Sequence, residues 1–214
     1  MADVLQFFIV ALSAVFFVVD PIGMVPIFLA ITAGDPPQKI RRTALRACVI
    51  AGAMLLFFGF FGGVIFTVFG VSLGAFRVAG GLLLLITALD MLNARPARTR
   101  TSPDEAEEAA QKEDPAIVPL AIPLLAGPGA IATVMVLMSQ GDGSVTRTVL
   151  PVLLAVVITL VASYFILRGA GFVQRVLGPS GVAILERVMG LILAAIAVQF
   201  IFDGGRALLF PEAS

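Results

Sequence analysis

Two short helix-breaking motifs inside apolar stretches carry the residue types best suited to bind a ligand. The first motif is Asp20-Pro21-Ile22-Gly23, and the second is Gly127-Pro128-Gly129. Proline lacks an amide hydrogen and clashes with the preceding helical turn, so each motif is expected to divide its helix into two halves. The backbone groups on either side of the break then lose their helical partners and become available to a ligand.

These freed backbone groups predict a small zwitterion as the ligand. Amides at the start of a helix favour an anion such as a carboxylate, and the predicted ones belong to Ile22, Gly23, Met24, Gly129, Ala130 and Ile131. Carbonyls at the end of the preceding half-helix favour a cation, here those of Val18, Val19, Leu125 and Ala126. Nearby small hydroxyls, at Ser13, Thr32 and Thr133, fit a small neutral ligand. The alternative for each motif is a simple proline kink repaired by neighbouring helices.

Asp20 is the sharpest single candidate, because an unpaired carboxylate in the middle of an apolar span is costly. It is predicted to contact an ammonium group, bind a coupling cation or carry a proton. The structural alternative is that Asp20 caps the second half-helix, for which aspartate is well suited, and the two roles are compatible. Gly127 replaces the acid in the second motif, so a role that depends on charge is asymmetric.

Two arginines occupy matching positions a few residues inside later spans. Arg77 and Arg187 either extend to the membrane interface or take part in gating. In the gating hypothesis Arg77 neutralises Asp20, and Glu186 neutralises Arg187.

The elements that carry these residues are membrane helices. Hydrophobic residues make up 59% of the 214 residues and charged residues 13%, against roughly 25% charged in ordinary soluble domains. Apolar runs of about the ~20 residues needed to cross a bilayer predict an all-α, multi-pass membrane protein. The predicted spans are Val4–Ile31, Ala44–Phe69, Ser72–Leu92, Ile117–Met138, Thr148–Leu167 and Val182–Phe202.

Composition also excludes several kinds of site. The chain has no histidine and one cysteine, Cys48, so an internal disulfide is impossible and neither a His/Cys metal site nor a cofactor is predicted. A Ser-His catalytic arrangement is excluded for the same reason. No nucleic-acid partner is predicted, and membrane lipid is the expected surrounding partner. The sequence leaves the oligomeric state open.

Lysine and arginine are unevenly distributed between the two predicted membrane faces. Eleven lie on the side of the first, third and fifth connections, and three lie on the other side. By the positive-inside rule, the basic side is cytoplasmic and both termini lie outside the cytoplasm. The charged segment 94–115 is interpreted as a cytoplasmic linker between residues 1–93 and residues 116–214.

These two parts resemble each other. An offset of 107 residues places Pro128 on Pro21, and an offset of 110 places Arg187 on Arg77. Because each part has three predicted spans, the second copy enters the membrane from the opposite side. Inverted repeats of this kind, with broken helices meeting near the bilayer midplane, are typical of secondary transporters.

Three long motifs carry a family resemblance: DPIGMVPIF, FRVAGGLLLLITALDML and VPLAIPLLAGPGAIATV. In these motifs the chain resembles the MarC family of prokaryotic membrane proteins, also called the neutral amino acid transporter family. The resemblance implies six transmembrane segments and transport of glycine, alanine or related small neutral amino acids across the cytoplasmic membrane. It also makes Asp20, Pro21 and Gly23, with Gly127, Pro128 and Gly129, the expected substrate region.

A secondary transporter working by alternating access, coupled to protons or sodium, is therefore the predicted function. No G-x-x-x-x-G-K-[ST] motif for ATP binding occurs in the sequence. The alternatives are a channel, since broken helices also line pores, and a non-transporting membrane assembly protein. An intramembrane hydrolase built on Asp20 and Asp90 is the alternative from a different functional class.

Overall fold

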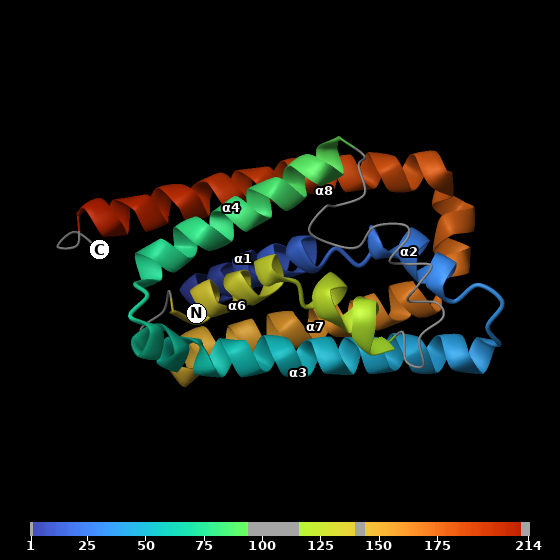
Figure 1. Ribbon diagram of the computed structural model, residues 1–214, viewed down its shortest axis with the longest axis horizontal. Helices are drawn as coiled ribbons and strands as arrows, with labels where there is room; N and C mark the ends of the chain where they lie inside the picture. Colours follow the sequence, from blue (N-terminus) through green and yellow to red (C-terminus); the bar gives the residue numbers. More distant parts are fainter. Residues whose placement is uncertain (1, 94–115, 140–143, 211–214) are drawn as a thin grey trace.

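The computed structural model describes residues 2–93, 116–139 and 144–210, and every regular element in these ranges is a helix (Figure 1). The predicted linker, residues 94–115, lies outside the described residues. The helices are α1 (Ala2–Val19), α2 (Met24–Ile31), α3 (Pro37–Phe69), α4 (Leu73–Leu92), η1 (Ala116–Leu125), α6 (Pro128–Ser139), η2 (Val145–Val149), α7 (Leu150–Arg168) and α8 (Ala170–Leu209).

Four of the described helical segments are long and apolar enough to cross a membrane: Pro37–Val64, Leu73–Leu92, Val145–Arg168 and Ser180–Leu209. A fifth span results if the bent pair α1 and α2 is counted as one. The predicted fourth span, Ile117–Met138, is present as η1 followed by α6, and neither helix alone has the length of a span. The structure thus gives an all-helical polytopic membrane protein with four to five candidate spans, where the sequence predicted six.

The first predicted span breaks at its predicted position. α1 ends at Val19, α2 begins at Met24, and the two axes differ by 44°. A bend of this size changes the direction of the chain without reversing it, and Figure 1 shows α2 continuing away from the N-terminal end. The segment is therefore a bent helix and not a hairpin that returns to the same end.

The second break is reached through an unusual helix. Pro119 and Pro123 remove two amide donors from the segment Ala116–Leu125, which winds as a π-helix, a wider form than the α-helix. The amide of Ala126 bonds to the carbonyl oxygen of Ala121 at 2.9 Å, five residues back. Regular α-helix resumes only at Pro128.

The short helices lie inside a shell of long ones. α1 packs against α7, η1 and α6 pack against α3, α4 packs against α6, and α2 packs against α8. α4 and α8 form the most extensive pair, running side by side along the bundle in Figure 1. Buried residues from both sides of each break belong to the core, among them Val19, Met24, Leu125 and Ala130.

The outer surface of this shell is strongly apolar. Large hydrophobic side chains are exposed along all four long helices, for example Phe60 on α3, Leu82 on α4, Phe165 on α7 and Leu191 on α8. Such continuous apolar surface marks contact with a membrane or a partner and is rare on soluble monomers. Together with the span lengths, it identifies lipid as the surrounding solvent.

α3 and α8 extend beyond their predicted spans. α3 begins seven residues earlier than predicted, at Pro37, and its first turns carry Lys39 and Arg41. α8 runs from Ala170 to Leu209 but has non-helical backbone at Gly178, whose φ is 64°. Glycine adopts this left-handed conformation at little cost, so Gly178 lets the chain turn between the segment after α7 and the long span that follows.

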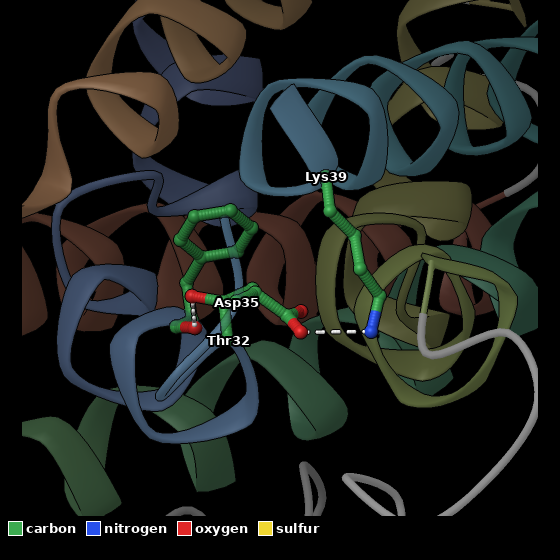
Figure 2. Close-up of polar contacts among 4 residues, drawn as sticks. Thr32, Asp35 and Lys39 are labelled. Carbon is green, nitrogen blue, oxygen red and sulfur yellow. Dashed lines mark hydrogen bonds and ion pairs between the residues drawn. The ribbon is translucent and has the colours of Figure 1, made fainter. Parts of the chain in front are cut away.

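The connection from α2 to α3 is fixed by side-chain hydrogen bonds, shown in Figure 2. The Thr32 hydroxyl donates to the carbonyl oxygen of Phe28 at 2.7 Å, where α2 ends. Two turns later Lys39 Nζ lies 2.8 Å from the Asp35 carboxylate, across one turn at the start of α3. This ion pair is largely exposed on the lysine side, so it orients the turn and adds only ~0–1 kcal/mol of stability.

Candidate functional site

The structure brings the two breaks together in the core. A Cβ atom built on Gly129 would lie 3.7 Å from Val18 Cγ1 and 2.9 Å from Leu84 Cδ2. Val18 is the next-to-last residue of α1, and Gly129 is the second residue of α6. The end of one broken helix and the start of the other are therefore in contact, packed on α4.

Asp20 is buried at the first break, with 1% of its surface exposed. Its backbone φ is +50°, the left-handed conformation that few residues other than glycine, asparagine and aspartate adopt readily. One carboxylate oxygen, Oδ1, accepts a hydrogen bond from the Gly23 amide at 3.0 Å. Asp20 therefore caps the turn at residues 21–23 that leads into α2, which is close to the structural role considered for it from sequence.

This cap changes the prediction that the α2 amides await a ligand anion. The Gly23 amide is already bound by Asp20, and the Met24 amide donates to the Asp20 carbonyl at 3.3 Å. A Cβ atom on Gly23 would overlap Asp20 Oδ2, so the carboxylate occupies the space that a side chain there would need. The protein itself supplies the anion at this helix start.

The second break is different, because Gly127 has no side chain to act as a cap. The Ile131 amide donates to the Gly127 carbonyl at 3.0 Å, which begins the regular α6 pattern. For the Gly129 and Ala130 amides, no acceptor is recorded within the described ranges. Binding of a ligand anion therefore stays a prediction for the amides at the start of α6, and no longer for those at the start of α2.

The remaining predicted residues around the breaks fall into two groups. Met24 is buried and Ile22 is partly buried against the core, while Pro21 lies buried beside Asp20. Pro128 is exposed and lines an apolar groove between α3 and α4, together with Ala126. The two prolines therefore face different surroundings, although their breaks are adjacent.

The small hydroxyls near the breaks do not present their donors to a ligand. Ser13, Thr32 and Thr133 donate to the carbonyl oxygens four residues earlier in their own helices, at 2.8, 2.7 and 2.9 Å. Such local bonds satisfy a buried hydroxyl without a partner from another helix.

The predicted gating residues lie away from the breaks, on the α4 and α8 pair. Arg77 packs against Gly204 of α8, and its Nε atom is buried with no hydrogen-bond partner in the part of the chain described. Arg187 is exposed on α8, and Glu186 beside it is partly buried.

Comparison with known proteins identifies the family. The model of the MarC family integral membrane proteins matches residues 5–209, nearly the whole chain. The chain belongs to the MarC family. This confirms the resemblance carried by the motifs around Asp20-Pro21 and Gly127-Pro128, and it establishes a multi-pass integral membrane protein.

Relatives of this MarC-family chain occur in archaea and bacteria. A UPF0056 membrane protein of Methanocaldococcus jannaschii is 39% identical over 202 residues, which cover 94% of this chain and 88% of the relative. The UPF0056 membrane protein YvbG of Bacillus subtilis is 35% identical over 207 residues, or 96% and 97% of the two chains. YhcE of Escherichia coli is 31% identical over 196 residues, or 92% and 90%. No solved structure matches the chain.

Proposed function

We propose that this protein is a secondary transporter that moves a small neutral amino acid of the glycine or alanine type across the cytoplasmic membrane by alternating access. The observation that carries the proposal is the contact between two broken helices in the core, with a buried acid at one break. Substrate sites of transporters lie at such paired breaks, where half-helix ends supply charge without many charged side chains.

The asymmetry of the two breaks supports a zwitterionic substrate. The amides of Gly129 and Ala130, at the uncapped start of α6, suit the carboxylate of an amino acid. The Asp20 carboxylate suits its ammonium group, since a buried ionised carboxylate forms strong charge-assisted hydrogen bonds with N–H donors. The same carboxylate is the proposed site of the coupling H⁺ or Na⁺.

Packing between equivalent positions supports two inverted repeats. Gly81 of α4 lies against Ala197 and Ile201 of α8, and Gly190 of α8 lies against Ala88 and Met91 of α4. Positions about 110 residues apart in the sequence therefore make matching contacts, each with the other helix of the pair. Thr32 at the end of α2 and Ser139 at the end of α6, which are 107 residues apart, both donate to a carbonyl oxygen in the preceding turn.

Directions of the broken helices support the same proposal. In Figure 1 the α1–α2 segment and the η1–α6 segment run in opposite directions through the middle of the bundle. Since Asp20 is 1% exposed, a site beside it is closed to both faces in this conformation, and transport requires a movement that opens one face at a time.

Counterflow in proteoliposomes tests the proposed function. Vesicles that contain the purified protein are preloaded with unlabelled alanine, and entry of labelled alanine or glycine is followed. The expected result is transient, saturable accumulation of label above its external concentration. A folded protein that gives no counterflow with any neutral amino acid would contradict the proposal.

Asp20→Asn separates the charge of Asp20 from its structural role. Asparagine also tolerates a left-handed φ and can accept the Gly23 hydrogen bond, so the fold is expected to be unchanged. Loss of a charge interaction worth ~1.4 kcal/mol lowers substrate affinity about tenfold, and loss of coupling lowers it further. The matched control is Asp35→Asn at the exposed pair with Lys39, for which normal counterflow is expected. Equal activity of the two variants would remove Asp20 from the mechanism.

A further inference from the structure

An apolar groove on the lipid-facing side of the molecule leads to the second helix break. It has a volume of about 470 Å³ and lies among α3, α4, η1 and α6. All of its lining residues are apolar, including Phe58, Leu83, Ile122 and Ala126. The volume falls within the range of about 300–1,000 Å³ typical of ligand pockets, and the lining excludes a zwitterion as the occupant.

The groove exists because three helices approach closely on one side and diverge on the other. α6 lies near glycines of both neighbours, since Cβ atoms built on Gly62 of α3 and Gly80 of α4 would lie 2.7 Å from Met135 and 2.8 Å from Ala132. Larger side chains, such as Phe58 and Phe76, stand along the walls of the groove. α6 therefore forms the floor of the groove, and α3 and α4 form its walls.

The two ends of the groove differ in exposure. Phe69, at the end of α3, is 76% exposed, and Val71 in the turn before α4 is 40% exposed. At the other end Ala126 is 2% exposed, although Pro128 at the start of α6 is exposed. The groove thus opens widely near the α3–α4 turn and reaches the break.

The groove is longer than one leaflet of a bilayer. Met54 and Phe69 both line it on one continuous helix, and at ~1.5 Å per residue the rise from one to the other is about 22 Å. Half of a hydrocarbon core of ~30 Å is about 15 Å. A groove of this length reaches from a membrane interface past the region of the midplane, so it can hold an acyl chain along its length.

From these observations we infer that the groove is a binding site for one acyl chain of a membrane lipid. The headgroup lies at the α3–α4 turn, and the end of the chain contacts Ala126 and Pro128 at the second break. The bound chain stabilises the position of α6 against α3 and α4. This inference rests on the groove and the membrane setting, and it holds whether or not the transported substrate is an amino acid.

Photo-cross-linking in vesicles tests the inference by depth. The protein is reconstituted into phosphatidylethanolamine and phosphatidylglycerol that contain a phospholipid with a diazirine either near the ester or at the end of one acyl chain. The expected result is that the deep probe labels Leu83 and Ala126, while the shallow probe labels Phe69 and Val71. The deep probe should label Leu83 and Ala126 at least roughly fivefold more than it labels Val157 and Val161, which are exposed near the middle of α7.

A matched pair of variants tests occupancy of the groove. Ala79 lines the groove on α4, and Ala195 is exposed near the middle of the long span of α8. Ala79→Trp should fill the groove and reduce deep-probe labelling of Leu83 at least roughly fivefold, and Ala195→Trp should leave it unchanged. Size-exclusion chromatography and the melting temperature establish that both variants are folded.

Three outcomes would overturn the inference. Equal labelling of groove residues and α7 residues in the wild-type protein would mean ordinary lipid contact without a site. Unchanged labelling of Leu83 in a folded Ala79→Trp variant would mean that the chain lies elsewhere. Cross-links from groove residues to a second copy of the protein would assign the groove to an oligomer interface.

Discussion

At the scale of single residues, Asp20 combines a costly backbone conformation with a favourable hydrogen bond. A left-handed φ costs of order 1–3 kcal/mol for most residues, and a lost helix cap costs about 0.5–2 kcal/mol. Asp20→Ala keeps the cost of the left-handed φ and loses the hydrogen bond of the cap. We expect it to lower the free energy of unfolding by about 1–3 kcal/mol, and Asp20→Asn to change it by less than about 1 kcal/mol. Denaturant unfolding in detergent micelles measures both values, and equal destabilisation by the two substitutions would contradict the capping role.

Gly23 gives a second prediction at this scale, because the Asp20 carboxylate lies where its side chain would be. Gly23→Ala would place a methyl group against Asp20 Oδ2 and 2.9 Å from Asp20 Cγ, so the carboxylate must move and its hydrogen bond to the residue 23 amide is weakened or lost. We expect destabilisation by about 1–3 kcal/mol. Gly63→Ala on α3 is the control, since its Cβ meets no atom within 4 Å and alanine favours helix by up to ~1 kcal/mol. A fall in melting temperature for Gly63→Ala equal to that for Gly23→Ala would exclude this explanation.

At the scale of helices, the contact between α4 and α8 depends on backbone approaching backbone. A Cβ atom built on Gly204 would lie 2.6 Å from the Gly74 carbonyl oxygen, and one built on Gly74 would lie 3.0 Å from the Gly204 carbonyl oxygen. Small residues at such crossings allow the close packing that holds membrane helices together. A side chain at either position forces the helices apart, because the nearest atoms that it meets include a main-chain carbonyl oxygen of the other helix.

Gly204→Ala is therefore expected to destabilise the protein by about 1–3 kcal/mol. The neighbouring residue Gly205 is a close control, since a Cβ atom there meets nothing within 4 Å. Gly205→Ala should leave stability unchanged or raise it by up to ~1 kcal/mol. Melting temperatures of the two variants in the same detergent provide the measurement, and the same shift for both would show that the α4–α8 contact is not limited by backbone approach.

The helices also show which features the sequence could predict. Apolar length and proline position determine the long spans and both breaks, because lipid requires an internally hydrogen-bonded backbone and proline interrupts it. For Asp20 the sequence supported two hypotheses, a capping role and a ligand-binding role. It could not predict the hydrogen bond to Gly23, because that bond depends on a left-handed φ that the residue type permits but does not require. The π-helical winding of η1 and the turn at Gly178 were not predicted, although Pro119 and Pro123 in η1 and a glycine that tolerates a positive φ are local signals in the sequence.

At the scale of the whole molecule, the positions of the chain ends follow from the number of crossings. Figure 1 shows the start of α1 and the end of α8 at one end of the bundle, and the start of α3 at the opposite end. Six crossings, with α1–α2 and η1–α6 each counted as one, place both termini on one side of the membrane. Five crossings would place them on opposite sides. From the positive-inside rule we predict that the end with the start of α3, where Lys39, Arg41 and Arg42 lie, faces the cytoplasm.

Thiol labelling in intact cells tests this topology. Cys48 is buried and is replaced by alanine, so that each reporter cysteine is the only thiol. A membrane-impermeant maleimide should label Leu209→Cys, at the exposed end of α8, and should label Gln38→Cys, at the exposed start of α3, only after permeabilisation. An epitope tag before residue 1 should be accessible from the same side as Leu209→Cys. Termini on opposite sides would exclude the six-crossing arrangement and with it two repeats of three spans each, because two repeats with equal numbers of spans always give an even number of crossings.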